Sequence, residues 1–185
     1  EMQARYCIVS VQDKGKERGA VLTLEKRVFS STTHHCTVTT TIFMRGDGGQ
    51  GGFGEAPQPP TALPERTADR TIDLQTMPQI ALIYRLSGDY NPIHASPSVA
   101  RKAGFERPIL HGLCTMGIAT RALLQGYCHF DPSRLKSMFV RFSRPVFPGE
   151  TIRTELFEES ERIRFRCLAL ERDLVVLDRG EAVVA

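Results

Sequence analysis

Apolar and polar residues alternate along the last fifty residues, a pattern typical of antiparallel strands with one buried face. The alternation is cleanest over 162–170, where Ile163, Phe165 and Cys167 share one face and three arginines, Arg162, Arg164 and Arg166, share the other. Strands are predicted here at 136–142, 151–158, 162–170, 174–177 and 182–184, with turns at Pro148-Gly149, Ser160-Glu161 and Arg179-Gly180.

Helical spacing is strongest over 112–124, where Leu113, Met116, Ala119, Ala122 and Leu123 recur at intervals that place them on one side of a helix. This helix is expected to end at Gly126, and its small residues allow a sheet to approach closely. Shorter helices are predicted after Thr76, which resembles a helix start, and at 98–103. One long helix followed by a strand meander predicts an α+β fold, with a curved antiparallel sheet around a central helix.

The first part of the chain has strand-like segments but no amphipathic helix of useful length. Six glycines between 46 and 54, followed by four prolines, exclude a helix or central strand there. The glycine run lacks a phosphate-loop motif and is interpreted as a flexible crossover. We therefore expect strands within 1–55, a linker at 56–71 and a complete domain at 72–185.

Composition narrows the class of protein. The 185 residues are 41% hydrophobic and 24% charged, which is typical of a globular protein. A net charge of +3 without a long basic run argues against nucleic acid, and no apolar stretch is long enough to span a membrane. Five separated cysteines without a CxxC pair, and the lack of a targeting signal at either end, lead us to expect a cytoplasmic protein.

The segment 84–94, Tyr-Arg-Leu-Ser-Gly-Asp-Tyr-Asn-Pro-Ile-His, carries the candidate chemistry. Gly-Asp-x-Asn-Pro alone is a good turn, because Asp and Asn bond their own backbone and Pro fixes the exit. His94 changes this interpretation, since Asp89 and His94 lie five residues apart across the turn. Such a pair could converge on one water molecule and act as acid and base.

A second segment, 107–115, places Gly112 at the first turn of the long helix. Backbone N–H groups there lack intrahelical partners, so the Gly112 N–H is suited to receive negative charge that develops on a carbonyl oxygen. The alternative is a flexible helix start. Cys114 is interpreted as a small packing residue rather than a nucleophile.

Together with Arg-Pro-Val-Phe-Pro-Gly-Glu at 144–150, these motifs resemble the MaoC-like, hydratase 2 family across about 72–185. The earlier strands, with Asp-Lys-Gly at 13–15 and the glycine loop, resemble the end of a degenerate N-terminal repeat in two-repeat members. The resemblance implies a hotdog fold and hydration of trans-2-enoyl-CoA to (3R)-3-hydroxyacyl-CoA in fatty acid metabolism. It also implies that no metal and no redox cofactor take part.

Residue roles follow from the same resemblance. It implies Asp89 and His94 as the catalytic pair, Asn91 as a group that positions the reacting centre, and the Gly112 N–H as the oxyanion donor. Lys14 and Phe142 match positions where such enzymes contact the CoA thioester.

Three alternatives stay open: a hotdog thioesterase, a dehydratase acting on carrier-protein thioesters, and a non-catalytic acyl-CoA-binding hotdog. The first is disfavoured because 112–124 contains no Asp or Glu, and the third because both Asp89 and His94 are present.

The arginine face of 162–166 is expected to be a solvated strand face rather than a site for CoA phosphates or a partner. Because the early strands leave apolar surface uncovered, we expect stabilisation by a longer parent sequence or by a homodimer or other homo-oligomer.

Overall fold

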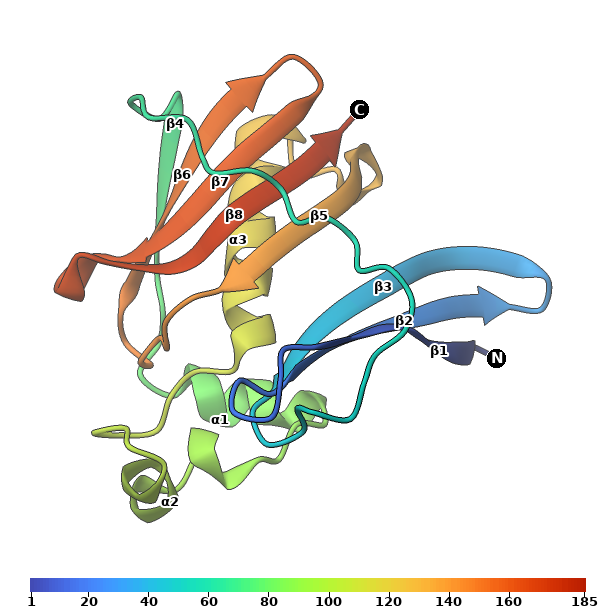
Figure 1. The fold of residues 1–185 in the computed structure, drawn as a ribbon. Helices are drawn as coiled ribbons and strands as arrows, with labels where there is room; N and C mark the ends of the chain where they lie inside the picture. The colour runs from blue at the N-terminus through green and yellow to red at the C-terminus, as the bar shows by residue number, and fades with distance from the viewer. The chain divides into compact units, whose positions relative to one another are not determined.

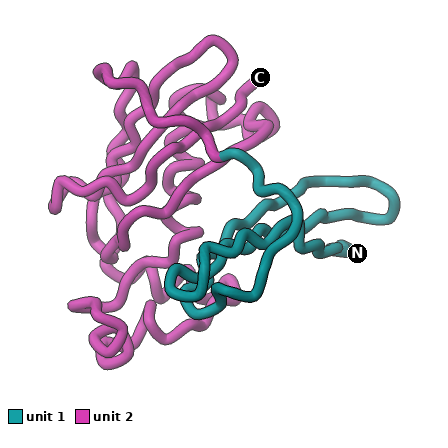
Figure 2. The backbone as a smooth tube through the Cα atoms, in the orientation of Figure 1, with its two compact units in different colours: residues 1–58 teal, residues 59–185 magenta.

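The computed structural model describes residues 1–185 and divides them into two compact units, 1–58 and 59–185 (Figure 2). The second unit holds a five-stranded antiparallel sheet with the strand order β4-β6-β7-β8-β5 (Figure 1). Its elements are β4 (Arg70–Gln75), α1 (Ile80–Tyr84), α2 (Pro97–Lys102), α3 (Gly112–Tyr127), β5 (Leu135–Phe142), β6 (Thr151–Glu159), β7 (Arg162–Ala169) and β8 (Leu174–Val184).

The core of this unit lies between α3 and the sheet. Ala119 and Leu123 of α3 are fully buried against strand residues that include Leu156 and Phe165. The alternation in β7 is confirmed on its inner face, where Ile163, Phe165 and Cys167 are all buried. The α+β architecture predicted from one long helix and a strand meander is therefore present.

The long helix does not end at Gly126, as the sequence indicated, but continues to Tyr127. A Cβ atom built on Gly126 would lie 3.1 Å from Leu156 Cδ1 and 3.4 Å from Ile72 Cδ1. The glycine therefore serves close packing of the helix on the sheet, and this tertiary contact overrides its local tendency to end a helix.

The turn expected at Arg179-Gly180 is also wrong, because β8 runs through it without a break. Arg179 has a left-handed φ of 49°, and a Cβ atom on Gly180 would lie 2.5 Å from both the ring and the carbonyl oxygen of Phe165. These residues form an irregularity within a strand, at which a glycine is required for a close approach.

Thr76 is not the helix cap that the sequence indicated. It follows the edge strand β4, which the sequence did not predict, and it is buried. Its N–H and hydroxyl donate to the Glu150 carbonyl at 3.0 and 2.8 Å, and its hydroxyl accepts from the Gly149 N–H at 2.9 Å. Thr76 thus joins β4 to the turn before β6.

The arginine face of β7 is paired rather than simply solvated. Arg162 and Arg166 form ion pairs with glutamates of the neighbouring strands, Glu181 and Glu155. Arg164 is only 4% exposed and donates to the backbone carbonyls of Thr61 and Gly180. Its guanidinium therefore holds the segment that leads into β4, whereas the side chains of Arg162 and Arg166 stay exposed to solvent, as expected for this face.

The first unit is a three-stranded antiparallel sheet of β1 (Gln3–Asp13), β2 (Ala20–Ser30) and β3 (Thr33–Met44), with no helix. It exposes several large apolar side chains: Tyr6, Ile8, Val38, Ile42 and Phe43. None of the helices in the structure is long and apolar enough to cross a membrane.

The glycine-rich run is organised by an acidic side chain and is not the flexible crossover that we expected. The Asp13 carboxylate accepts the N–H groups of Gly15, Gly49 and Gly51 at 2.7–2.8 Å. These bonds, led by the one from Gly49, hold the pKa of Asp13 below its usual value. The loop thus encloses an anion, but that anion is the chain's own carboxylate.

Candidate active site

The loop from Gly88 to His94 is built by local hydrogen bonds between side chains and backbone. Gly88 has a φ of +114°, a conformation that favours glycine, and it ends a short 3₁₀ helix. Asp89 Oδ1 then accepts the Asn91 N–H, and Asn91 Oδ1 accepts the Ile93 N–H, both at 3.1 Å. The turn predicted from these residue types is therefore present, and it fixes the backbone between the two candidate catalytic groups.

His94 is 9% exposed, and its ring is held by one backbone bond. Its Nδ1 lies 2.8 Å from the Ile109 carbonyl oxygen, which can only accept a hydrogen bond. We therefore assign the proton of the neutral ring to Nδ1, which leaves a lone pair on Nε2. Nε2 has no protein partner.

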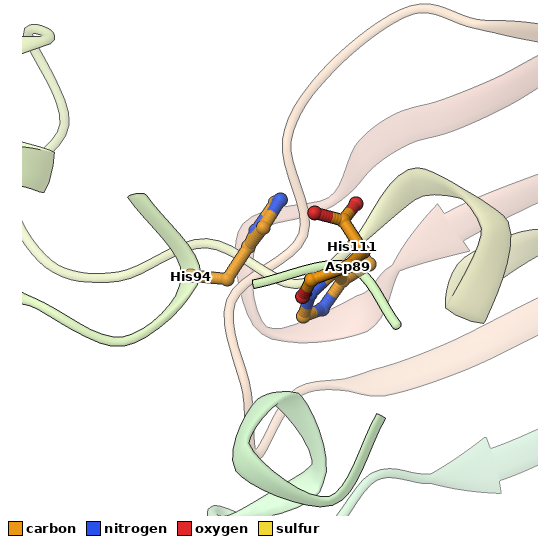
Figure 3. Close-up of side chains that lie close together, drawn as sticks. All are labelled: Asp89, His94 and His111. Atoms are coloured by element: carbon orange, nitrogen blue, oxygen red, sulfur yellow. The ribbon is translucent and has the colours of Figure 1, made fainter. Parts of the chain in front are cut away.

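The structure brings Asp89 and His94 together, as the five-residue spacing suggested. Figure 3 shows the Asp89 carboxylate and the tip of the His94 imidazole close to one another. One carboxylate oxygen of Asp89 and one ring nitrogen each of His94 and a third residue, His111, all lie within 4.8 Å of one another. An exposed carboxylate beside an imidazole lone pair is an arrangement that can hold and polarise one water molecule.

His111 is the site residue that the sequence analysis missed. It is 1% exposed, directly precedes α3, and places its Nε2 3.2 Å from the backbone oxygen of Asp89. Its ring stacks on His94 with centroids 3.7 Å apart, and it contacts the Tyr84 ring at 4.7 Å. The available signal is the His111-Gly112 pair within 107–115, a segment from which the sequence analysis singled out only Gly112 and Cys114.

The two histidines and Asp89 do not form a favourable metal site. The rings are stacked with an angle of 25° between their planes, so their in-plane lone pairs do not converge on one point. His94 Nδ1 and His111 Nε2 are moreover engaged with backbone carbonyl oxygens. The geometry is better suited to acid–base chemistry than to cation binding.

Gly112 begins α3, and its N–H has no hydrogen-bond partner. The ring of Phe142 packs against it, since a Cβ atom on Gly112 would lie 3.1 Å from Phe142 Cε1. The structure thus brings together Gly112 and Phe142, and through His111 it links Gly112 to the Asp89–His94 loop. Lys14 lies in the other unit, where its Nζ is 3.2 Å from Gln12 Oε1.

Cys114 lies in the first turn of α3 and is 8% exposed. Burial raises the pKa of its thiol, which therefore stays protonated at neutral pH. This supports the interpretation of Cys114 as a packing residue.

An antiparallel sheet packed on one central helix is the hotdog arrangement expected from the resemblance. Residues 59–178 match the family model described as MaoC like domain. The chain belongs to this family, which confirms the resemblance seen in its motifs.

Three relatives illustrate the match. The chain is 40% identical to "Enoyl-CoA hydratase 2, peroxisomal" of Arabidopsis thaliana, over 94% of this chain and 59% of that protein. It is 42% identical to "3-hydroxyacyl-thioester dehydratase Y" of Mycobacterium tuberculosis, over 94% of this chain and 62% of that protein. The crystal structure of a MaoC-like dehydratase from Phytophthora capsici superimposes with a TM-score of 0.93 at 38% identity, over 100% of this chain and 62% of the other. The chain thus spans about three fifths of the length of these relatives.

Proposed function

We propose that this chain is an (R)-specific 2-enoyl-CoA hydratase, which adds water reversibly to trans-2-enoyl-CoA to give (3R)-3-hydroxyacyl-CoA. The observation that carries the proposal is the convergence of the Asp89 carboxylate and the His94 imidazole. The names of the relatives from Arabidopsis and Mycobacterium support it, since hydration and dehydration are two directions of one reaction.

The mechanism begins with polarisation of the enoyl thioester. Its carbonyl oxygen accepts the free N–H of Gly112, so that the negative charge of the developing enolate is held at the positive end of α3. Withdrawal of electrons toward that oxygen makes C3 of the acyl chain electrophilic.

One water molecule then binds between Asp89 and His94. His94 Nε2 takes a proton from the water as its oxygen bonds to C3, and Asp89 orients the water and stabilises the imidazolium that forms. The pair returns one proton to C2, so that a hydroxyl and a hydrogen are added with no net gain or loss of protons by the enzyme. Because both groups lie on one side of the substrate, the addition is syn and gives one stereoisomer.

The remaining predicted residues serve substrate binding in this proposal. Asn91 uses its Oδ1 in the turn, and its amide N–H groups stay free to position the reacting centre. The exposed ring of Phe142 contacts the thioester beside Gly112. Lys14 supplies a cation for CoA. The substrate is the only partner required, and neither metal nor redox cofactor takes part in these steps.

The proposal is tested by incubating the chain with crotonyl-CoA and with a longer trans-2-enoyl-CoA. We expect loss of the conjugated enoyl absorbance without release of free thiol, and a product that only a (3R)-specific dehydrogenase oxidises. Release of CoA thiol would instead identify a thioesterase, and binding without turnover a non-catalytic acyl-CoA-binding protein. Reaction with the carrier-protein thioester alone would identify a carrier-protein dehydratase.

Substitution of Cys114 separates the hydratase from a thiol-dependent enzyme. Since burial keeps the thiol protonated, Cys114→Ala is expected to retain kcat within about twofold, with at most a small loss of stability from a lost packing contact. The check is the crotonyl-CoA hydration rate of the variant alongside the parent. A hundredfold loss of kcat in a fully folded variant would assign Cys114 to the chemistry.

The cytoplasmic location and a homodimeric or other homo-oligomeric state stay predictions. The Arabidopsis relative is peroxisomal by name, so the family includes members of another compartment.

A further inference from the structure

His111 is the most enclosed polar residue of the site, and the mechanism above does not use it. Its ring lies between two others, stacked on His94 at 3.7 Å and tilted against Tyr84 at 4.7 Å. In Figure 3 the His111 ring lies directly beside Asp89. His111 therefore contacts both Asp89 and His94 of the site loop, and the next residue along the chain is Gly112.

The hydrogen bonds of His111 define its tautomer. Nε2 faces the backbone oxygen of Asp89 at 3.2 Å, which can only accept, so Nε2 carries the proton. Nδ1 then has no proton, and it is buried without a partner. Burial lowers the pKa of His111, because a charged ring in this position would lose its hydration.

We propose that His111 is a positioning residue for the hydration reaction, which sets the relation between the Asp89–His94 pair and the helix N-terminus at Gly112. This inference rests on the proposed function. The neutral ring donates from Nε2 to the Asp89 backbone and supports the flat face of His94. It thereby limits movement of the carboxylate and the imidazole relative to the N–H that receives the carbonyl oxygen.

Such a role affects the rate more than the binding. The carboxylate and the imidazole must both hydrogen-bond one water molecule while its oxygen lies close enough to attack C3. A displacement of about 1 Å can cost roughly a hundredfold in rate. The bulk of an acyl-CoA is bound by other groups, so its affinity does not depend on this small displacement.

Three substitutions of His111 separate the donor from the ring. In His111→Gln the amide nitrogen takes the place of Nε2 and keeps the donor for Asp89. In His111→Asn the amide is one bond shorter and does not reach, and in His111→Phe the stacking ring is kept but the donor is lost. Asn and Gln are matched in polarity, so the difference in kcat between these two variants reports whether the amide donor reaches the Asp89 carbonyl.

The experiment measures kcat with crotonyl-CoA, the Kd for saturated butyryl-CoA by calorimetry, and the melting temperature of each variant. We expect kcat to fall by about ten- to a hundredfold in His111→Asn and His111→Phe, while the Kd stays within about threefold of the parent. His111→Gln should recover kcat to within about fivefold of the parent. In an Asp89→Asn background, His111→Asn should lower kcat no further than about twofold, because both changes affect the same acid–base pair.

Equal kcat values for the Gln and Asn variants would overturn the proposal, as would a fall of kcat that is matched by an equal loss of binding. If His111→Phe does not fold, the Gln–Asn comparison and the double variant still decide the matter. A parent chain that does not hydrate crotonyl-CoA contradicts the proposed function. An active parent whose Asn variant keeps its kcat contradicts only the role of His111.

Discussion

Asp89→Asn is expected to lower kcat for crotonyl-CoA hydration by about a hundred- to ten-thousandfold, the usual contribution of a general acid–base group. The asparagine keeps the Oδ1 that accepts the Asn91 N–H, so the turn persists while the negative charge that stabilises the His94 imidazolium is lost. Because the carboxylate acts chiefly in the transition state, the Kd for saturated butyryl-CoA should stay within about threefold of the parent. Steady-state kinetics together with calorimetry make this comparison.

His94→Asn is the matching change at the other group. The asparagine nitrogen occupies the position of Nδ1 and keeps the bond to the Ile109 carbonyl, whereas the atom corresponding to Nε2 is absent. A loss of kcat of about the same size is expected, and the double variant should be only slightly slower than either single variant, since the two groups act as a unit. Ser98→Ala is a suitable control, because the Ser98 hydroxyl bonds only Ser96. Variants of Asp89 and His94 that kept near-parental kcat would show that this loop is merely a turn.

The parts of the site that could be predicted are those determined by neighbours in sequence. Asp89 and His94 lie on one short loop, whose turn follows from the preferences of Gly, Asn and Pro. The contact of His111 with both depends instead on how the segment before α3 crosses that loop. A His-Gly pair gives no sign of stacking, of a tautomer or of a donor for Asp89, so His111 had to be found in the structure.

The same distinction between local and distant contacts explains where the fold was predicted wrongly. Alternation and helical spacing identified α3 and the strands after it, because burial of one face governs both patterns, whereas the edge strand β4 was missed. Gly126 and Arg179-Gly180 have the residue types of a helix end and a turn, yet each glycine accommodates a side chain from a distant strand. Tertiary packing decides such positions, and a single sequence does not reveal it.

Glu150, the last residue of the 144–150 motif, stabilises the fold and lies outside the proposed acid–base pair. Its carboxylate is 5% exposed, accepts the Phe147 N–H at 2.8 Å and binds the guanidinium of Arg172 through two hydrogen bonds. Arg172 also donates to the Pro145 carbonyl, and its guanidinium lies 4.9 Å from the centre of the Phe147 ring. One carboxylate therefore joins both ends of the 145–150 turn to the segment before β8.

Removal of that carboxylate is expected to cost about 3 kcal/mol of unfolding free energy in Glu150→Ala, since it leaves a mostly buried guanidinium without its counter-charge and the Phe147 N–H without an acceptor. For a unit of this size the melting temperature should fall by roughly 10 °C. Glu150→Gln keeps an acceptor for Phe147 and should lose less. Thermal melts followed by circular dichroism, with urea titrations for the free energy, test both variants.

The matched control breaks an exposed pair of the same kind. Asp73 binds Arg153 through two hydrogen bonds, but the side chains are 41% and 38% exposed, and such pairs contribute about 0–1 kcal/mol. Asp73→Ala should therefore leave the melt nearly unchanged. The Leu110 N–H donates to the Val146 carbonyl at 2.7 Å, so the turn that Glu150 stabilises also holds the segment leading to His111 and Gly112. If Glu150→Ala melted like Asp73→Ala, burial of the Glu150–Arg172 pair would not be what holds this turn, and the start of α3 would need another support.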